Sequence, residues 1–285
     1  LSRSGDRVQA RYELFDVNRE ERILGETAAA PASNMRSLAH HISDKVYEAI
    51  TGVPGAFSTK LAYITLDTAN GKPRYRLQVS DVDGKRARIR LESQEPILSP
   101  AWSPDGEKLA YVSFETGKPV IFVHELATGN RTKVADFPGL NSAPAWSDDG
   151  RSLLMTLSKD GNAEIYRMNL DTRQLTKLTN HWAIDTEPSY DATGKGIFFT
   201  SDRSGGPQIY HMDTPGAEPR RITFGSRYNA RPRPDNDGNY VYYVHQRDRA
   251  FHIARTELKT GEETILTRTL ALTEIADGNG AAAAE

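Results

Sequence analysis

Residues 100–111 read PAWSPDGEKLAY, and this stretch decides the fold because its pattern returns every 44 residues. The returning prolines are Pro100, Pro144, Pro188 and Pro232. The returning glycines are Gly106, Gly150, Gly194 and Gly238, and a third series is Ile121, Ile165, Ile209 and Ile253. A period of about 20 to 50 residues is typical of a solenoid, a propeller or another repeat array. Such arrays serve more often as binding surfaces than as catalysts.

Each repeat is predicted to form four short β-strands joined by tight turns. In the first copy, one strand leads into the Asp-Gly turn at 105–106, and residues 108–114, 120–126 and 131–137 supply the other three. Asp-Gly is a strong hairpin signal because glycine adopts positive φ at little cost. Four strands in about 44 residues match a propeller blade and leave no room for a helical solenoid. The second strands are apolar, as packing between sheets requires, around Tyr111, Met155, Phe199 and Tyr243.

A further copy precedes these and lacks its first strand. Residues 60–66, 75–82 and 86–92 supply the other three strands, but no counterpart of PAWSPDG stands before them. Ring closure is simplest when one blade takes strands from both chain ends, so the missing inner strand is expected from the C-terminus. A sixth blade would begin at 272–274, and the residues after it form a low-complexity tail without a strand signal. The expected fold is mainly β, a six-bladed β-propeller with five blades visible in this chain.

Residues 1–54 are predicted to be the C-terminal part of a small α/β domain. The propeller is expected at residues 55–274, and residues 275–285 are left as a low-complexity or unassigned tail. Before the propeller, residues 7–17 alternate as a strand and residues 22–28 form its hairpin partner.

A helix is predicted over residues 34–50. Ser33 or Asn34 can cap its free backbone N–H groups, and Gly52 and Pro54 end it. An apolar stripe suited to packing on a sheet is formed by Leu38, Ile42, Val46 and Ile50. His40 and His41 are placed on the exposed side of this helix, where adjacent residues point about 100° apart, so no metal site is predicted there.

Composition excludes several classes of function. The 285 residues carry 36 Lys and Arg against 38 Asp and Glu, a net charge of −2, which argues against nucleic acid as a partner. No apolar run approaches the roughly 18 residues of a membrane span. Cysteine is absent, which removes disulfides, thiol nucleophiles and Cys-ligated zinc. No nucleophile elbow, zinc-protease motif or P-loop occurs, so no catalytic residues are predicted and the chain is not expected to be an enzyme.

Strand order indicates which face of the propeller binds a partner. The turns between first and second strands, and between third and fourth strands, share one face and stay short and glycine-rich. The loops before each first strand lie on the other face and diverge, at residues 95–98, 139–143, 181–187 and 226–231. Trp182 and Tyr228 in these loops either fill gaps between blades or face a partner. Two readings also remain for one group of arginines, a solvated face or a rim that meets an acidic partner: Arg227, Arg231, Arg233, Arg247 and Arg249.

These repeats resemble the TolB family over about residues 5 to 275. The likeness is carried by residues 100–111, 200–210 (TSDRSGGPQIY), 60–64 (KLAYI), 79–84 (VSDVDG), 186–188 (TEP) and 51–57 (TGVPGAF). The resemblance implies an N-terminal α/β domain followed by a six-bladed propeller whose C-terminus completes the first blade. It also implies a periplasmic component of the Tol–Pal system, with roles in outer-membrane integrity, envelope constriction at cell division and colicin import.

The same resemblance implies that the lipoprotein Pal binds over the channel mouth of the propeller. The residues predicted for that contact are Leu98, Leu140, Asn141, Ser142, Ala143, Asp185, Thr186, Glu187, Tyr228, Asn229 and Arg231. The family recruits TolA through an N-terminal segment that is not expected in this chain, and colicins can exploit the same surfaces. Some family propellers hold calcium in the channel; no ligands for it are identified here, and no cofactor is predicted.

One alternative function belongs to a different class. Prolyl-oligopeptidase-like enzymes carry a similar propeller that gates or binds substrate. Such enzymes need a hydrolase domain with a nucleophile elbow, and none follows Glu274 in this sequence. The interaction scaffold is therefore the favoured function, with the gating propeller as its alternative.

Overall fold

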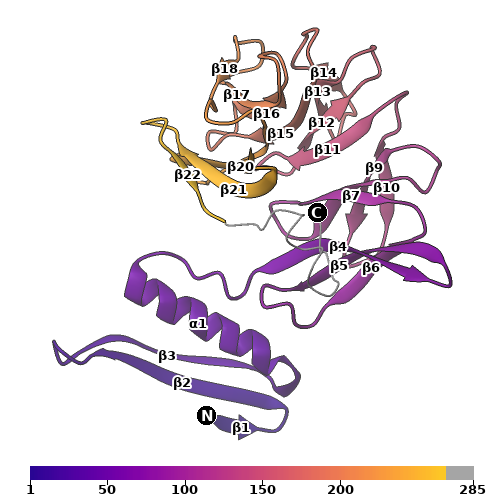
Figure 1. The fold of residues 1–285 in the computed structure, drawn as a ribbon. Helices are drawn as coiled ribbons and strands as arrows, with labels where there is room; N and C mark the ends of the chain where they lie inside the picture. The colour runs from indigo at the N-terminus through magenta and orange to yellow at the C-terminus, as the bar shows by residue number, and fades with distance from the viewer. Residues whose placement is uncertain (268–285) are drawn as a thin grey trace. The chain divides into compact units, whose positions relative to one another are not determined.

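The computed structural model describes residues 1–267 and is built mainly of antiparallel β-strands (Figure 1). The chain divides into two compact units, which are described separately. Unit 1 comprises residues 1–65 and 76–92, and unit 2 comprises residues 66–75 and the chain from Ser93 onward.

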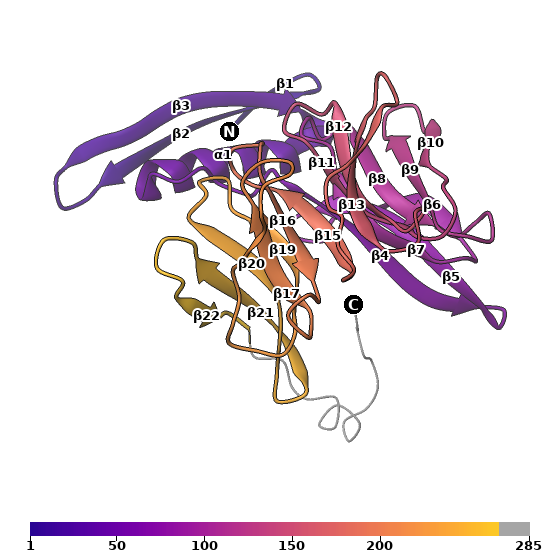
Figure 2. The same ribbon diagram turned by 90° about the horizontal axis from the view of Figure 1, so that it is seen from above.

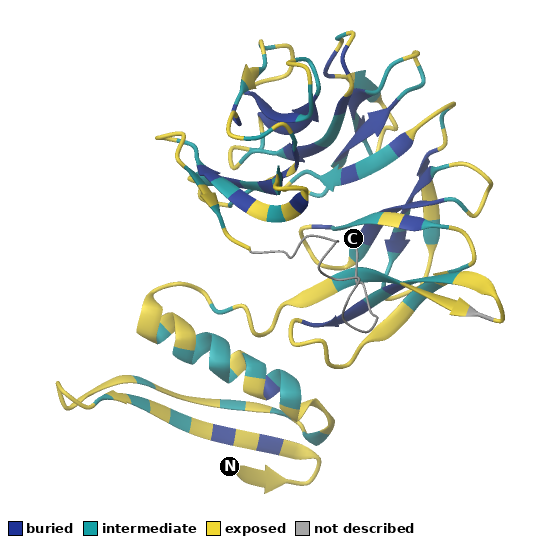
Figure 3. Ribbon diagram, viewed as in Figure 1, coloured by how far each residue is buried: buried dark blue, intermediate teal, exposed yellow. Residues whose placement is uncertain are grey.

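The N-terminal part of unit 1 is a β-sheet with one helix packed on it. The elements are β1 (Ser2–Ser4), β2 (Arg7–Asp16), β3 (Glu21–Pro31), η1 (Ala32–Asn34) and α1 (Met35–Thr51). The sheet order is β1-β2-β3, and α1 contacts β3. Burial alternates along β2, with Val8 and Ala10 buried between exposed neighbours, as the period of a half-buried strand requires (Figure 3). The predicted hairpin and helix are therefore confirmed.

The ends and the apolar stripe of α1 differ in part from the prediction. Asn34 is the N-cap residue, but its side chain makes no capping hydrogen bond. The C-terminus ends as predicted at Gly52, whose φ of 72° lets its N–H donate to Glu48 O at 2.8 Å. Leu38 is buried, whereas Ile50 at the far end of the stripe is exposed. The stripe thus packs mainly at its N-terminal end.

The first repeat forms a three-stranded sheet of order β4-β5-β6. Its strands are β4 (Lys60–Ala69), β5 (Lys72–Asp81) and β6 (Arg88–Ser93), as predicted from the sequence. Within residues 1–267 no fourth strand pairs with this sheet. The predicted completion of this blade from the C-terminus, and the predicted start of a sixth blade at residues 272–274, lie outside the described residues.

Unit 2 holds four antiparallel sheets of four strands each, one for each 44-residue repeat. In chain order the sheets are β7 (Ile97–Trp102), β8 (Lys108–Ser113), β9 (Val120–Glu125), β10 (Arg131–Ala135); β11 (Asn141–Trp146), β12 (Ser152–Leu157), β13 (Glu164–Asn169), β14 (Leu175–Lys177); β15 (Asp185–Tyr190), β16 (Ile197–Ser201), β17 (Gln208–Met212), β18 (Arg220–Arg221); and β19 (Asn229–Pro234), β20 (Tyr240–Arg247), β21 (Ala250–Glu257), β22 (Glu263–Ile265). Within each sheet the strands follow chain order. This is the strand arrangement of propeller blades.

The core of unit 2 lies between neighbouring sheets. Strand β11 contacts β7, β15 contacts β11, and β19 contacts β15, so the first strand of each sheet lies on the inner side (Figure 2). Met155, Phe199 and Tyr243 are fully buried at the positions that the sequence predicted to be apolar. One such layer joins Leu154 and Ile165 of one sheet to Phe199 and Tyr210 of the next. Burial of these side chains stabilises the stacking of the sheets.

Each inner strand carries a bulge that the repeat pattern did not predict. The pairing register shifts at the same point in all four sheets. The residue just before the recurring proline has positive φ there: 51° at Ser99, 49° at Ala143, 54° at Glu187 and 60° at Arg231. Proline has no N–H to donate to the ladder, so the pairing is interrupted at that point and the strand bends.

Candidate partner-binding face

The loops before the inner strands of unit 2 present apolar side chains to solvent. We call these loops the loop face; it comprises residues 95–98, 139–143, 181–187 and 226–231, with the adjoining loops between second and third strands. Trp182 is 78% exposed and Ile184 is 49% exposed. Leu98 and Leu140, both predicted partner-binding residues, are also exposed. Trp182 was predicted either to fill a gap between blades or to face a partner, and its exposure decides against the first interpretation.

The loop that carries Trp182 is held in place by polar contacts. The Asn162 Nδ2 donates to His181 O at 2.9 Å and to Ala183 O at 2.6 Å. The backbone N–H of His181 donates to Oε1 of the buried Glu164 at 2.7 Å. The N–H of Ile184 donates to Asp202 Oδ1 at 2.8 Å. A loop fixed in this way loses little conformational entropy when it binds a partner.

Three of the predicted contact residues are fully buried: Asn141, Asp185 and Asn229. They lie 44 residues apart and each begins an inner strand. Asn141 Nδ2 donates to Phe137 O at 2.8 Å, and its Oδ1 accepts from Phe137 N at 3.0 Å. Side chains without exposed surface cannot touch a partner in this structure, so these three position the loops instead. The sequence located these loops but did not show which of their side chains turn inward.

The buried residues of the last two sheets differ in charge. Asp185 accepts from Arg203 Nη2 at 2.9 and 2.7 Å. Asn229 stands at the same repeat position and instead donates to Gln208 Oε1 at 2.9 Å, with its Oδ1 2.9 Å from His245 Nδ1. One loop is thus anchored by an ion pair and the next by neutral hydrogen bonds.

The predicted contact residues on the inner strands are partly exposed. Ser142, Ala143, Thr186 and Glu187 are half-buried, and Arg231 is exposed. Arg231 Nε donates to Glu187 Oε1 at 2.9 Å, and Thr200 Oγ1 donates to Glu187 Oε2 at 2.9 Å. The bulge residues of two neighbouring sheets are thereby joined by an ion pair.

Tyr228 is half-buried and packs edge-on against Phe251, with ring centroids 5.5 Å apart. Burial raises the pKa of its phenol above the usual value. Tyr228 therefore fills a gap within its own blade in part, while keeping some surface on the loop face.

The chain resembles known proteins in sequence. A family model described as the TolB beta propeller domain matches residues 47–275. The chain belongs to the TolB family. It is similar to the Tol-Pal system protein TolB of Hahella chejuensis, 54% identical over 135 residues, which are 47% of this chain and 31% of that protein. The protein of the same name from Nitrosococcus oceani is 50% identical over 144 residues, 50% of this chain and 33% of that protein. The matched segment is thus about a third of these relatives' length.

Solved structures of TolB and of other propellers resemble the chain to different degrees. The crystal structure of TolB from Acinetobacter baumannii superposes with a TM-score of 0.89 at 43% identity, over 94% of this chain and 67% of that one. A puromycin hydrolase superposes with a TM-score of 0.57 at 14% identity, over 72% of this chain and 35% of that one. The second likeness shows the fold alone. The mainly β propeller architecture predicted from the repeats is therefore confirmed.

The carboxylates on the inner strands of unit 2 are paired with arginines. The two carboxylates on β7, β11, β15 and β19 are those of Asp185 and Glu187, and arginine pairs with both. Neither carboxylate is therefore free to bind the calcium that the family resemblance suggests, and no metal enters the function proposed below.

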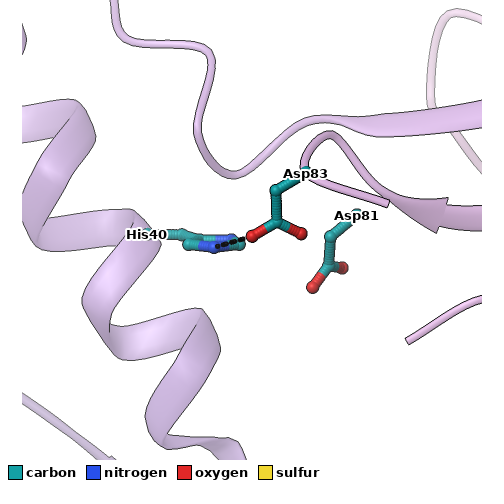
Figure 4. Close-up of side chains that lie close together, drawn as sticks. All are labelled: His40, Asp81 and Asp83. Atoms are coloured by element: carbon teal, nitrogen blue, oxygen red, sulfur yellow. Dashed lines mark ion pairs between the residues drawn. The ribbon is translucent and has the colours of Figure 1, made fainter. Parts of the chain in front are cut away.

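Unit 1 contains one cluster with metal-ligand atoms, formed by His40, Asp81 and Asp83 (Figure 4). His40 is half-buried and its Nε2 lies 3.4 Å from Asp83 Oδ2, which corrects its predicted place on the exposed side of the helix. Arg86 donates to both Asp81 oxygens at 2.8 and 3.1 Å, and Arg36 pairs with Asp83. The hydrogen bond from Arg86 lowers the pKa of Asp81 below its usual range. Two guanidinium groups already neutralise these carboxylates, so the cluster is an ion-pair network between α1 and the β5–β6 turn.

Among the described residues no helix is long and apolar enough to cross a membrane.

Proposed function

We propose that the chain is a non-catalytic interaction scaffold of the Tol–Pal envelope system and binds the lipoprotein Pal through the loop face of unit 2. The observation that carries the proposal is Trp182, a 78% exposed tryptophan on a loop held by hydrogen bonds from buried and half-buried groups. Exposed aromatic side chains on rigid supports are the usual anchors of protein interfaces. Membership of the TolB family supports the choice of partner.

The proposal includes a place in the cell. The relatives are named as Tol-Pal system proteins, and we infer a periplasmic location for this chain from that system. A contribution to envelope constriction at division and use by colicins belong to the same proposal, as does a link to TolA, which would use the family's N-terminal segment rather than unit 2.

In the experiment, the soluble domain of Pal is titrated into the purified chain, and the heat of binding is measured by isothermal titration calorimetry. Leu140→Glu and Thr186→Arg place a charge on partly exposed parts of the loop face. We expect each to weaken Pal binding at least about tenfold, because a buried unpaired charge costs more than 1 kcal/mol at an interface. Folded variants that bind Pal as tightly as the original chain would overturn the site.

A matched control lies on the opposite, glycine-rich face. Arg151 follows the turn between β11 and β12 and is 72% exposed on its side chain. Arg151→Gln changes the charge by one unit, as Thr186→Arg does in the opposite sense, but away from the loop face, so Pal affinity should stay within about twofold. Loss of binding in this control would mean that net charge, not the loop face, governs the interaction.

The alternative of a gating propeller rests on the likeness to puromycin hydrolase, which at 14% identity shows the fold alone. The test is hydrolysis of peptide substrates by the complete gene product that contains this chain. Turnover that survives removal of contaminating proteases would favour the alternative over the scaffold.

A further inference from the structure

An open groove of about 720 Å³ lies on the loop face beside the last described sheet, β19–β22. Its lining includes Phe224, Arg227, Arg247, Arg249 and Glu263. The sheet face beneath it packs on the preceding sheet, since Tyr243 and Ile265 belong to a core cluster with Phe198 and Ile209. The groove is lined by the loop before β19, by the end of β20 with the turn to β21, and by β22, all within unit 2.

The repeat explains why this groove is open. Residue 203 in the preceding sheet corresponds to residue 247. Arg203 turns inward, pairs with Asp185, and lies over the rings of Phe199 and Tyr210 at 5.4 and 5.0 Å. The residue of the last sheet that corresponds to Asp185 is Asn229, which carries no charge and whose Oδ1 lies 2.9 Å from His245 Nδ1. Arg247 therefore stays outside, with 64% of its side chain exposed.

In the first two sheets of unit 2, the side chain at this repeat position also forms an ion pair. Glu115 accepts from Arg131 at 2.8 and 2.9 Å, and Lys159 Nζ lies 2.8 Å from Asp160 Oδ1. Within residues 1–267 the one ion pair of Arg247 is a long contact of 3.6 Å to Asp248, whose side chain is 90% exposed. Such an exposed pair contributes little, so Arg247 is available to another carboxylate.

Two further arginines of the groove have no anionic partner among residues 1–267. Arg227 and Arg249 are both exposed, and neither makes an ion pair within the described chain. The groove also holds two carboxylates: Glu263 accepts from Tyr243 Oη at 2.6 Å and lies 3.7 Å from His245, and Asp248 lies 3.6 Å from Arg247. Three arginines against two carboxylates leave the groove with a net positive charge.

We propose that this groove binds an acidic segment of the protein partner, whose carboxylates pair with Arg227, Arg247 and Arg249. The inference rests on the proposed function, because the groove opens on the loop face assigned to that partner. Arginine forms forked pairs with carboxylates, and Phe224, 70% exposed at the groove, offers apolar contact to the same segment. Three of the five arginines grouped in the sequence, Arg227, Arg247 and Arg249, thus form a rim that meets an acidic partner rather than a solvated face.

The test compares the double variant Arg227→Gln/Arg249→Gln with the control Arg151→Gln, which removes one exposed arginine from the opposite face. Both changed residues of the groove are exposed and unpaired in the described chain, so folding should be unaffected, which thermal melting checks. Pal affinity is measured at about 0.05 M and 0.5 M salt. We expect a loss of about ten- to thirtyfold in the double variant at low salt, shrinking at high salt, and no change in the control. Unchanged affinity of the folded double variant would overturn the groove while leaving Pal binding intact.

A second arm separates this inference from the proposed function. Hexaglutamate is titrated into the original chain and the double variant at low salt, followed by the fluorescence of the tryptophans or by chemical shifts. Weaker binding to the double variant supports the groove even when Pal does not bind the chain at all. Equal response of the two proteins to hexaglutamate overturns it.

Discussion

Arg203 Nη2 lies 2.9 Å from Oδ1 and 2.7 Å from Oδ2 of Asp185. This ion pair holds the buried end of the loop that carries Trp182. Asp185 is fully buried and the side chain of Arg203 is only 15% exposed. The pair therefore sits where each charge depends on the other for solvation. It links the first strand of its blade, β15, to the loop that follows the second, β16.

Asp185→Asn reproduces the residue found 44 positions later and removes the charge that holds Arg203. We expect a loss of about 3 kcal/mol in the free energy of unfolding, because a buried guanidinium is left without its counter-charge. The measurement is urea denaturation followed by circular dichroism. The exposed pair Arg151–Asp171, at 3.7 Å, is the comparison, and Asp171→Asn should cost less than about 1 kcal/mol. Equal losses in the two variants would show that Asp185 and Arg203 gain nothing from burial.

Trp182→Ala should separate binding from stability. The side chain is 78% exposed, so the free energy of unfolding should change by no more than about 0.5 kcal/mol. If Trp182 anchors the partner, Pal affinity should fall about thirtyfold, which corresponds to about 2 kcal/mol. Surface plasmon resonance with immobilised Pal measures the change. A matched control is Phe251→Ala, since Phe251 is also exposed but leans on Tyr228, and it should affect stability more than binding.

Because of the buried His245, we expect the protein to lose stability in mild acid. Burial lowers the pKa of this imidazole below its ordinary 6.5; the nearby Glu263 opposes the shift, and His252 and Arg247 add to it. Because the unfolded chain takes up a proton at higher pH than the folded chain, stability is complete above pH 6.5 and falls as the pH drops through the lowered pKa. The melting temperature at pH 7.5 and 5.5 measures this. His245→Gln should show a smaller drop between the two values, whereas His41→Gln on the exposed side of α1 should not change it.

Gly196→Ala should destabilise the sheet β15–β18 for steric reasons. A Cβ at Gly196 would meet the carboxylate of Asp191 and would lie 2.8 Å from Met212 O and 2.9 Å from Asp213 O. Backbone carbonyls cannot move aside cheaply, so we expect a loss of about 2–3 kcal/mol in urea denaturation. Gly194, with φ of 67°, has room for a Cβ, and Gly194→Ala should cost only about 1 kcal/mol through backbone strain. The steric explanation fails if the two variants are equally stable.

The repeat pattern predicted much of the architecture because it records local needs of the chain. Gly106, Gly150, Gly194 and Gly238 mark turns in which the structure has φ between 67° and 70°. Met155, Phe199 and Tyr243 mark the apolar positions that the structure buries. Turn geometry and alternation depend on neighbours in sequence, so they can be read before any tertiary contact is known.

The candidate site was predicted less well, although its loops were located correctly. Asn141, Asp185 and Asn229 were expected on the surface and are buried, whereas Trp182 was left out and is exposed. His40 was expected on an exposed helix face and instead faces Asp83. For Asp185, for His40 and for the Trp182 loop, the decisive contacts come from segments far away in sequence, such as Asn162 for the Trp182 loop.

The sequence by itself determined that this chain is a β-propeller of 44-residue blades with one regular face and one variable face. That information is repeated in every blade, and strand alternation and turn chemistry express it locally. Only the tertiary structure decided what each variable position does. Asp185 and Asn229 occupy the same repeat position, yet one captures Arg203 inside while the other leaves Arg247 on the surface. The physical reason is that burial and charge pairing depend on which side chains the fold brings together, and these differ between blades that share one backbone pattern.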